Sequence, residues 1–465
     1  MTGRLVGSGD AVAAARLLAA SGRPWCWLDG EAAAPGEPRV SYFGVASEVR
    51  IAEPGAEREF LAGLRAAPER PDAPAMPGFH GGWAVALSYE FGVALLGLEP
   101  ARDAGTGLPA PAFALRLDGV LAIDHERGAS ELRGDTSELE ALLDTRLPGD
   151  LPSFGPHRYF GSEPVNRSET TATSEERDER RLWRRTDADY AREVEACRSA
   201  IRDGEAYVLC LTDTAEVRGR FDPLELFLRL RARGGAVRGG VIAAGDRALV
   251  SASPERFLSV RGRRILTHPI KGTRPRGADP EADRALAEQL AADPKERAEN
   301  LMIVDLMRND LGRVCEAGSV GVEGFLRVES HPHVHQLVST VAGTLRAGAD
   351  VFDAIEVCFP GGSMTGAPKR RAVEILRELE GAPRGLYSGC FGWVGDGGDA
   401  ELAMTIRSVE LRAVDGAPGL ALIGAGGGIT ADSDPERETA EKHLKAAPLL
   451  TAVGALSSSP HPRYS

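Results

Sequence analysis

The chain has 465 residues, 43% of them hydrophobic and 26% charged, a balance that excludes wholesale disorder and suggests two to three domains or one large two-layer unit. The formal net charge is −13, and no basic patch is interleaved with aromatic residues, which argues against nucleic-acid binding. No apolar run reaches the roughly 18 residues of a membrane span. The first ten residues lack the pattern of a secretory signal. We therefore expect a cytoplasmic protein that binds neither nucleic acid nor membrane.

The N-terminal region, residues 1–147, is expected to hold short strands with a helix near each end. A polar stretch rich in Pro, Ser and Thr follows at 148–185, and it is typical of a linker or long surface loop. Helices are predicted at 11–20 and 131–145, and strands at 25–28, 40–43, 81–89 and 115–123.

Residues 186–452 mix helices with hairpin-like strands, and a flexible tail is expected at 453–465. Because there is no regular β-α-β alternation, the pattern argues against a Rossmann or TIM fold and for an α+β fold. The predicted helices are 187–202, 223–232, 295–309, 367–380 and 435–446. The predicted strands are 206–211, 239–244, 248–251, 334–344, 388–394, 402–414 and 419–424.

Lysine is scarce in this chain. Only five of the 55 basic residues are lysine, and all five lie in the second half. Lysine, unlike arginine, can lose its proton and attack carbon. Each one is therefore a candidate for lysine-specific chemistry: Lys271, Lys295, Lys369, Lys442 and Lys445. The six cysteines form no C-x-x-C pair, so we expect free thiols in a reducing compartment.

Lys271 lies between a proline-led strand end and Gly272, where backbone can approach a ligand. Two strands joined by the turn at 261–263 would bring Glu255 near it. A lysine nucleophile and a carboxylic acid form a coherent pair for a substitution reaction. The alternative is a surface lysine paired with a glutamate, since such ion pairs are common.

Two helices carry glutamates three residues apart, so each pair points to one face. The pairs are Glu296 with Glu299 and Glu438 with Glu441. Brought together, four carboxylates would repel one another unless a hard cation lay between them, and Mg²⁺ fits that requirement. The alternative for each pair alone is a solvated helix face.

Anion-binding elements are expected at a glycine loop, 359–369, that enters a helix and offers backbone N–H groups. Arg407, alternating with apolar neighbours on a strand, would clamp a carboxylate, and glycines 426–428 offer further donors. The alternative is turn glycines and a paired core arginine. Together these elements suit a small dianionic carboxylated substrate.

With these motifs in this order, the chain resembles the chorismate-utilising enzymes. That family includes the anthranilate synthase large subunit, aminodeoxychorismate synthase component I, isochorismate synthase and salicylate synthase. The resemblance is dense over 186–450 and thinner over 11–145, where Trp27-Leu28-Asp29 and Ser88-Tyr89-Glu90-Phe91-Gly92 match the family's N-terminal region. It implies a large two-layer, β-sandwich-like core of mostly antiparallel sheets surrounded by helices.

Three positions distinguish the members of this family. Anthranilate synthases carry alanine at the position of Lys271, whereas aminodeoxychorismate synthases typically carry lysine. Isochorismate and salicylate synthases use a water-activating lysine where this chain has Val208. Anthranilate synthases place a histidine before Leu-Val-Ser, where this chain has Gln336, with His335 one residue earlier. A one-residue slip flips a strand side chain to the other face, so that role is not carried over to His335. All three positions favour the aminodeoxychorismate synthase branch.

The resemblance implies that Mg²⁺, held by Glu299 and Glu441 with Glu296 and Glu438 nearby, binds the ring carboxylate of chorismate. It also implies that Lys271 attacks C2 while Glu255 protonates the departing C4 hydroxyl. Ammonia then adds at C4 and gives 4-amino-4-deoxychorismate. The implied substrate-binding residues are Thr273, Thr365, Gly366, Arg407, Gly426, Gly427 and Lys445.

Lys271 needs a free lone pair, and we expect Arg274, Arg276 and desolvation to lower its pKa. Nothing in the sequence resembles a glutaminase nucleophile loop, so ammonia would come from solution or from a separate glutamine amidotransferase subunit. The stretch 234–238 departs from a family segment that contributes to feedback binding of amino acids. An anthranilate-forming or 2-amino-2-deoxyisochorismate-forming enzyme and a non-catalytic binding protein remain alternatives. The sequence leaves open whether the product serves folate or a secondary metabolite, and which acid, if any, replaces the family histidine at Gln336.

Overall fold

The computed structural model describes residues 4–5, 10–33, 36–65, 78–102, 111–144, 182–234, 236–331, 334–414 and 417–456. Most of the predicted linker and most of the predicted tail lie outside these residues. Residues 182–185, at the end of the predicted linker, lie along a strand of the fold: Trp183 forms a bridge with Ala215, and the Arg184 amide donates to the carbonyl of Thr214.

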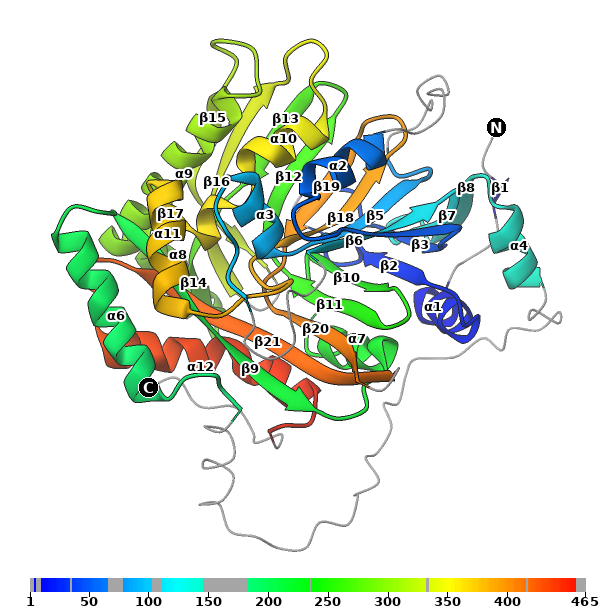
Figure 1. Ribbon diagram of the computed structural model, residues 1–465. Helices are drawn as coiled ribbons and strands as arrows, with labels where there is room; N and C mark the ends of the chain where they lie inside the picture. The colour runs from blue at the N-terminus through cyan, green and yellow to red at the C-terminus, as the bar shows by residue number, and fades with distance from the viewer. Residues whose placement is uncertain are drawn as a thin grey trace, which may run out of the picture.

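Two large sheets form the centre of the molecule (Figure 1), and all the strand pairs among the described residues are antiparallel. In spatial order, the 11-stranded first sheet contains β1 (Arg4–Leu5), β8 (Ala129–Gly134), β7 (Gly119–Asp124), β3 (Val40–Val45), β2 (Trp25–Asp29), β10 (Arg238–Ala243), β11 (Arg247–Ser253), β20 (Ser408–Val414), β21 (Ala417–Ile429), β9 (Val208–Arg218) and β17 (Gly366–Ala367).

The 10-stranded second sheet runs β14 (Ile270–Pro275), β16 (Val334–Thr344), β13 (Arg264–His268), β12 (Arg256–Arg261), β19 (Ala400–Met404), β18 (Cys390–Gly395), β5 (Gly82–Leu87), β6 (Ala112–Leu117) and β4 (Glu48–Ile51), with β15 (Gly321–Ser330) paired to β16. Both sheets join the N-terminal region to the rest of the chain, because β2 pairs with β10 in the first and β5 with β18 in the second. The N-terminal strands are therefore continuous with those of the second half.

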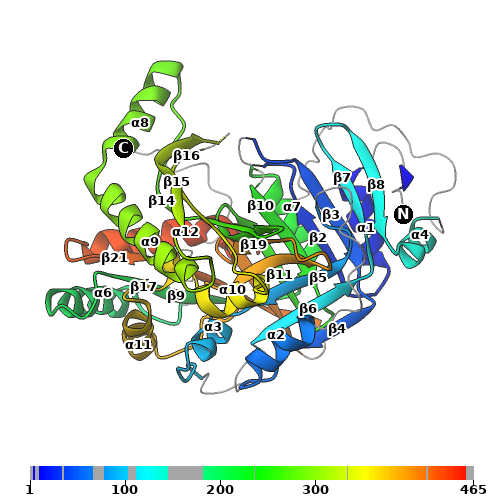
Figure 2. The same cartoon turned by 90° about the horizontal axis from the view of Figure 1, so that it is seen from above.

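The two sheets pack face to face, and helices cover their outer faces (Figures 1 and 2). One apolar cluster joins Leu28, Ile242 and Leu249 of the first sheet to Phe391 and Ala403 of the second. Within the described residues the helices are α1 (Ala11–Ala20), α2 (Glu57–Arg65), α3 (Tyr89–Leu95), α4 (Ser137–Asp144), α6 (Asp187–Arg202), α7 (Pro223–Arg231), α8 (Pro280–Ala292), α9 (Pro294–Gly312), α10 (Val351–Cys358), α11 (Lys369–Glu380) and α12 (Pro435–Ala452), with a 3-10 helix η1 (Gly362–Met364). This arrangement confirms the predicted α+β fold with a two-layer antiparallel core.

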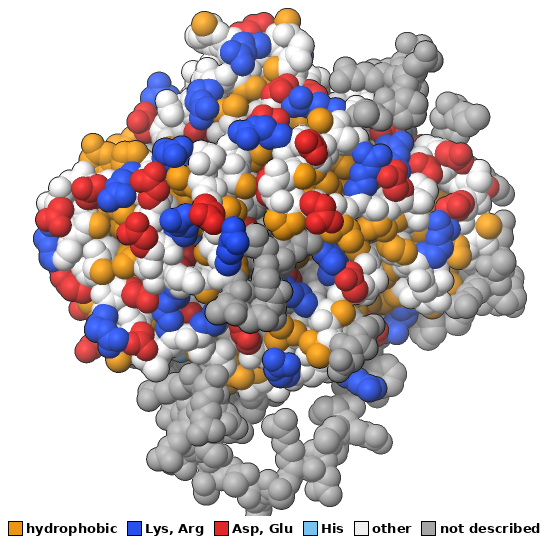
Figure 3. Space-filling model, in the orientation of Figure 1, with side chains coloured by type: hydrophobic (Ala, Val, Ile, Leu, Met, Phe, Trp, Pro, Cys, Tyr) orange, Lys and Arg blue, Asp and Glu red, His pale blue; other side chains and the backbone are white. Residues whose placement is uncertain are grey.

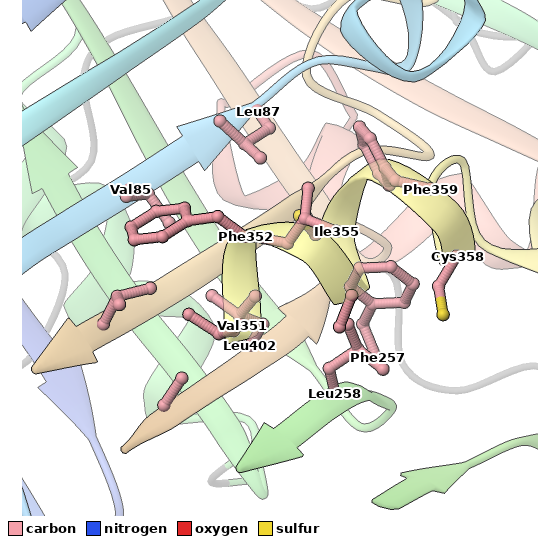
Figure 4. Packing of buried hydrophobic residues seen from close by; sticks show 14 of the residues in the cluster. Val85, Leu87, Phe257, Leu258, Val351, Phe352, Ile355, Cys358, Phe359 and Leu402 are labelled. Atoms are coloured by element: carbon pink, nitrogen blue, oxygen red, sulfur yellow. The ribbon is translucent and has the colours of Figure 1, made fainter. Parts of the chain in front are cut away.

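Each outer face has its own apolar cluster. On the second sheet, α10 packs Val351, Phe352 and Ile355 against Phe257 of β12 and Leu402 of β19 (Figure 4). On the first sheet, α1, α7 and α12 cover the opposite side. None of the helices in the described ranges is both long and apolar enough to cross a bilayer. On the face shown in Figure 3, Lys and Arg side chains are interspersed with Asp and Glu.

Several predicted elements coincide with the observed ones, including the helices at 11–20 and 187–202 and the strand at 334–344. Two predicted strands were wrong in the same way. The predicted strand at 115–123 is divided between β6 of the second sheet and β7 of the first, and 402–414 is divided between β19 and β20. Apolar alternation continues through a corner where the chain passes from one sheet to the other, so periodicity does not reveal the break.

The helix predicted at 131–145 was also too long, because β8 takes its first part and α4 begins at Ser137. The glycines at 426–428, beyond the end of the strand predicted at 419–424, lie within β21 itself. There, a Cβ on Gly424 would clash with the Tyr387 ring, and a Cβ on Gly426 would clash with the carbonyl of Leu211. These glycines therefore permit close packing of a strand and do not form a loop.

A buried arginine ties four parts of this fold together. Arg384 donates to the carboxylate of Glu380 at 2.7 and 2.8 Å, to the carbonyl of Met364 at 2.8 Å and to the carbonyl of Cys210 at 2.9 Å. Its guanidinium lies 4.0 Å from the centre of the Tyr89 ring. It thus connects α11, η1, β9 and α3.

We expect Arg384→Met to lower the free energy of unfolding by about 3–5 kcal/mol, because it leaves the buried Glu380 carboxylate without its cation. Denaturant unfolding followed by circular dichroism measures this loss. The matched control is Arg370→Met on α11, the helix that carries Glu380, where an exposed ion pair with Glu374 predicts a loss below about 1 kcal/mol. Equal stability of the two variants would contradict the role assigned to Arg384.

Candidate active site

A β-hairpin brings the two predicted catalytic residues together. Glu255 directly precedes β12, and Lys271 is the second residue of β14. Between them, β12 and β13 pair antiparallel, with Arg256 opposite His268, around the predicted turn at 261–263. The positive φ of 57° at Gly262 suits glycine in such a turn. The spatial proximity expected from the sequence is therefore present.

Lys271 points into a confined space with its side chain 14% exposed. Its Nζ lies 3.9 Å from Oε2 of Glu299 on α9. On another side lies Gly428 of β21, where a Cβ would stand 3.4 Å from Nζ and 3.5 Å from Val208 of β9. The amine is thus bordered by a carboxylate, a strand without a side chain and an aliphatic residue.

The pKa of Lys271 is raised above its ordinary value, which corrects the expected lowering. Desolvation by burial lowers it, but Glu299, Cys210, Glu255 and Glu296 together raise it by more. The two arginines expected to lower it are neutralised by acids of their own. Arg274 pairs with Asp293 at 2.8 Å, and Arg276 pairs with Asp283 at 2.7 Å. The amine therefore needs its carboxylates neutralised before it can lose a proton readily.

Glu255 is suited to hold a proton near neutral pH. Burial raises its pKa to about 7, while a hydrogen bond to the Ser363 side chain, the Lys271 ammonium and Arg238 oppose the rise. A carboxyl group with a pKa near the working pH is an effective general acid. Its main chain is held as well, since the Met404 amide donates to the Glu255 carbonyl at 3.0 Å.

The four glutamates of α9 and α12 converge from opposite sides of the glycine strand. Glu299 and Glu438 are buried, while Glu296 and Glu441 are partly exposed. A Cβ on Gly272 would lie 3.0 Å from Oε2 of Glu296. Similarly, a Cβ on Gly427 would lie 3.1 Å from Oε2 of Glu438 and 3.8 Å from Oε1 of Glu441. The absence of side chains at Gly272 and Gly427 lets the carboxylates approach.

Lys295 joins the two helices through their carboxylates. Its Nζ lies 3.8 Å from Oε1 of Glu299 and 3.6 Å from Oε1 of Glu438. Partial burial lowers its pKa, but Glu438, Glu299, Glu441 and Glu296 raise it by more, so the net shift is upward. All four glutamates therefore act on this one ammonium group.

The donor set fits a hard divalent cation. Among the residues the structure describes, no three His, Cys, Asp or Glu side chains are already close enough to hold a metal ion. An ammonium nevertheless lies between Glu299 and Glu438, so the cluster already binds a positive charge there. Carboxylates are the ligands that Mg²⁺ takes in proteins. Bound there, Mg²⁺ would neutralise the acids and hold an anionic substrate.

Two of the predicted substrate-binding residues, Lys445 and Arg407, join the same cluster. Lys445 pairs with Glu441 at 2.7 Å and donates to the carbonyl of Gly426 at 2.8 Å. Nη1 of Arg407 donates to the carbonyl of Lys445 at 3.0 Å. Arg407 was expected on a strand. It lies instead between β19 and β20, with a φ of 52°. Gly426 and Gly427 pair with Thr212 and Leu211 of β9.

The other predicted substrate-binding residues make contacts of a different kind. Thr365 is buried, and its hydroxyl lies 3.3 Å from the carbonyls of Gly361 and Gly362. Gly366, with a φ of 146°, pairs with Leu209 in the first sheet. Thr273 is exposed and pairs with Gln336. The structure thus brings Gly427 and Lys445 to the glutamates, and Gly426 and Arg407 to Lys445, while the hydroxyl of Thr365 is used within its own loop.

The positions that distinguish the family members also have clear surroundings. Val208 borders the site beside Gly428, so an aliphatic group stands next to the Lys271 amine. Gln336 of β16 is buried and pairs with Thr273 of β14. His335 faces away, with Nδ1 2.9 Å from Oγ of Ser330 and Nε2 2.9 Å from Oδ1 of Asp283. The ring of His335 is therefore not available to the site.

Sequence reasoning missed two hydroxyl groups that hold carboxylates. Ser363 hydrogen-bonds the Glu255 side chain, and Ser433 donates to Oε1 of Glu438 at 2.7 Å. A serine in a glycine loop or before a helix is ordinary, so no sequence signal distinguished either. Lys295 was marked only by the scarcity of lysine.

Two of the five lysines are structural, contrary to the expectation of lysine-specific chemistry. Lys369 donates to Asp310 and to the carbonyl of Cys358, both at 2.6 Å. Lys442 is fully buried and donates to Asp213 at 3.2 Å, with the Trp183 and Tyr190 rings 4.3 and 4.5 Å away. A compact ammonium fits such enclosures, whereas a planar guanidinium needs more room.

Comparison with known proteins assigns the family. Proteins described as chorismate binding enzymes match residues 23–451, so the chain belongs to that family. It is 41% identical over 392 residues to an aminodeoxychorismate synthase of Streptomyces pristinaespiralis, covering 80% of this chain and 52% of the relative. It is 44% identical over 320 residues to anthranilate synthase component 1 of Haloferax volcanii, covering 69% of this chain and 57% of that protein.

Solved structures agree with the fold. Anthranilate synthase component I of Streptococcus pneumoniae is similar with a TM-score of 0.68 at 25% identity, covering 92% of this chain and 90% of that one. The menaquinone-specific isochorismate synthase of Escherichia coli also has a TM-score of 0.68, at 19% identity, covering 97% and 94%. The chain spans about half the length of the aminodeoxychorismate synthases of Streptomyces pristinaespiralis and Streptomyces griseus, with 52% of each covered.

We expect Gly428→Ala to weaken chorismate binding at least about tenfold while changing the free energy of unfolding by less than about 1 kcal/mol. The new methyl group would make only ordinary contacts, at 3.4–3.5 Å, but it would occupy the space beside the Lys271–Glu299 pair. Isothermal titration calorimetry with chorismate and Mg²⁺ measures the affinity. The control is Gly312→Ala, where no atom lies within 4 Å of the added Cβ. Unchanged affinity in Gly428→Ala would show that substrate does not use this space.

Proposed function

We propose that this chain converts chorismate and ammonia to 4-amino-4-deoxychorismate. The observation that carries the proposal is the Lys271 amine, enclosed beside Glu299 and within electrostatic reach of the protonatable Glu255. Relatives named aminodeoxychorismate synthase, 41% and 40% identical over most of this chain, support it.

The proposed reaction has two substitutions. In the first, the neutral Lys271 amine forms a bond to C2 of chorismate, the ring double bonds shift, and the C4–O bond breaks as Glu255 protonates the leaving hydroxyl. In the second, ammonia forms a bond to C4, the double bonds shift back, and the C2–N bond to Lys271 breaks. The overall exchange is one ammonia for one water, and the enolpyruvyl group stays on the ring.

The residues around Lys271 support this outcome over those of related reactions. Val208 has no basic group with which to activate water at C2, which disfavours isochorismate formation. Gln336 stands where the resemblance implies a histidine for pyruvate loss, which disfavours anthranilate formation. Because anthranilate synthases are also close in sequence, product identification with chorismate, ammonium and Mg²⁺ is the decisive test. Anthranilate or 2-amino-2-deoxyisochorismate as the product, or tight binding without turnover, would contradict the proposal.

The supply of ammonia and the location belong to the same proposal. A separate glutamine amidotransferase subunit would deliver ammonia, so glutamine should replace ammonium in the assay only when that subunit is added. The six cysteines are buried and unpaired, which suits the expected reducing cytoplasm.

Lys271→Ala and Lys271→Arg should both abolish a covalent chorismate adduct and slow amination at least about 100-fold, because neither side chain is a nucleophile. Intact-mass spectrometry of protein quenched during turnover detects the adduct. Lys271→Arg keeps the charge beside Glu299, so it separates loss of the nucleophile from loss of the ion pair. A wild-type rate in either variant would exclude Lys271 as the nucleophile.

The rate constant kcat/KM should stop rising as pH passes about 7, because burial sets the pKa of Glu255 near that value and loss of its proton then offsets the growing fraction of neutral Lys271, whose pKa lies higher. Glu255→Gln, which cannot donate an acidic proton, should be slow, and its kcat/KM should continue to rise above pH 7. The stability linked to Glu255 depends on the pKa of Glu255 alone. Burial raises the pKa of Glu255 from 4.5 to about 7, so stability from its protonated form is lost as pH rises between these values. A pH profile of Glu255→Gln identical to that of the wild type would contradict the assignment.

A further inference from the structure

Lys295 is in an unusual place for a basic residue. It lies in the first turn of α9, one residue after Pro294. A cation there opposes the helix dipole, which favours acids at the N-terminus. Its position is therefore not explained by stabilisation of α9. What it contacts are the carboxylates of two helices, Glu299 of its own helix and Glu438 of α12.

Through its two ion pairs, Lys295 allows two carboxylates that would otherwise repel each other to lie close together. Glu299 and Glu438 are both buried, and no other cation in the described part of the chain is recorded as pairing with both of them. The Lys295 side chain is 53% exposed, so its stem reaches in from solvent. It can withdraw without disturbing the core.

The same carboxylate oxygens cannot serve Lys295 and a metal ion together. A magnesium ion takes oxygen ligands at about 2.0–2.1 Å and has little tolerance for distorted geometry. The ammonium lies between Oε1 of Glu299 and Oε1 of Glu438, at 3.8 and 3.6 Å. A metal that draws these two helices' carboxylates together must displace it.

We propose that Lys295 is the internal counter-cation of the metal-free site and leaves the glutamates when a divalent cation binds. This inference rests on the metal role in the proposed function. In the metal-free protein, Lys295 keeps α9 and α12 in register by neutralising Glu299 and Glu438. In the loaded protein it stands in solvent, and the affinity for the metal is set by competition with this tethered ammonium.

The test is a titration of Mg²⁺ alone into the full chain after removal of metals with EDTA, by calorimetry and by the midpoint of thermal unfolding. Lys295→Met keeps the length of the side chain and removes its charge. We expect it to bind Mg²⁺ about tenfold more tightly, since two partly exposed ion pairs no longer compete. In EDTA it should unfold at a lower temperature than the wild type, and saturating Mg²⁺ should remove that difference.

The matched control is Arg297→Met. Arg297 is two residues along the same helix, is exposed, and donates to the carbonyl of Ala291. Arg297→Met changes the net charge by the same amount as Lys295→Met. Because Arg297 does not pair with Glu299 or Glu438, we expect its Mg²⁺ affinity and its unfolding midpoint in EDTA to be unchanged. If Lys295→Met and Arg297→Met tighten binding equally, the effect is one of overall charge and the proposal is wrong.

The remaining outcomes are also decisive. Unchanged or weaker Mg²⁺ binding in Lys295→Met would overturn the counter-cation role, even where the wild type aminates chorismate normally. Failure of both proteins to bind Mg²⁺ would overturn this inference together with the metal role. The amination assay on the wild type reports separately on the proposed reaction, because the titration requires no turnover.

Discussion

The main constraint on this structure is electrostatic: four glutamates from two helices far apart in the sequence lie close together, and their charges must be neutralised for the fold to be stable. Glutamates in α9 and α12 lie on either side of β21, and like charges so placed repel strongly unless they are neutralised. Three lysines and one arginine do this in the structure: Lys271 at Glu299, Lys295 at Glu299 and Glu438, Lys445 at Glu441, and Arg274 at Glu296. The Lys271 amine is thus part of the charge balance. Its basicity follows from that balance rather than from nearby arginines.

The backbone supplies the room for this cluster. A strand of ordinary residues in place of β21 would place one Cβ inside the Tyr387 ring and others against Glu438 and Lys271. Bare glycines let helix α12 approach from one face and β14 from the other. The corner between β19 and β20 performs a related task, because the left-handed conformation of Arg407 turns its side chain toward α12. Chemistry and packing therefore use the same few residues.

Much of this could be predicted from the sequence because the signals are local. The hairpin between Glu255 and Lys271 follows from two short strands and a glycine turn, and the glutamate pairs follow from helical spacing. The predictions failed where the answer depends on a neighbour distant in sequence. Lys442 carries the same signal as Lys271, yet an aromatic enclosure and Asp213 bury it completely. Likewise, the hydroxyl of Thr365 serves its own loop, which the motif does not reveal.

The sequence by itself determined which groups are present: one lysine beside a glycine, one acid sixteen residues before it, and two glutamate pairs on helices. Residue type and short-range spacing are enough for that, because side-chain direction within a helix or hairpin depends only on the local backbone. Only the tertiary structure decided which of these groups meet, where the chain changes sheets, and how charged each group is. Those properties depend on burial and on the charges of residues far along the chain, and spacing along the sequence carries no record of either.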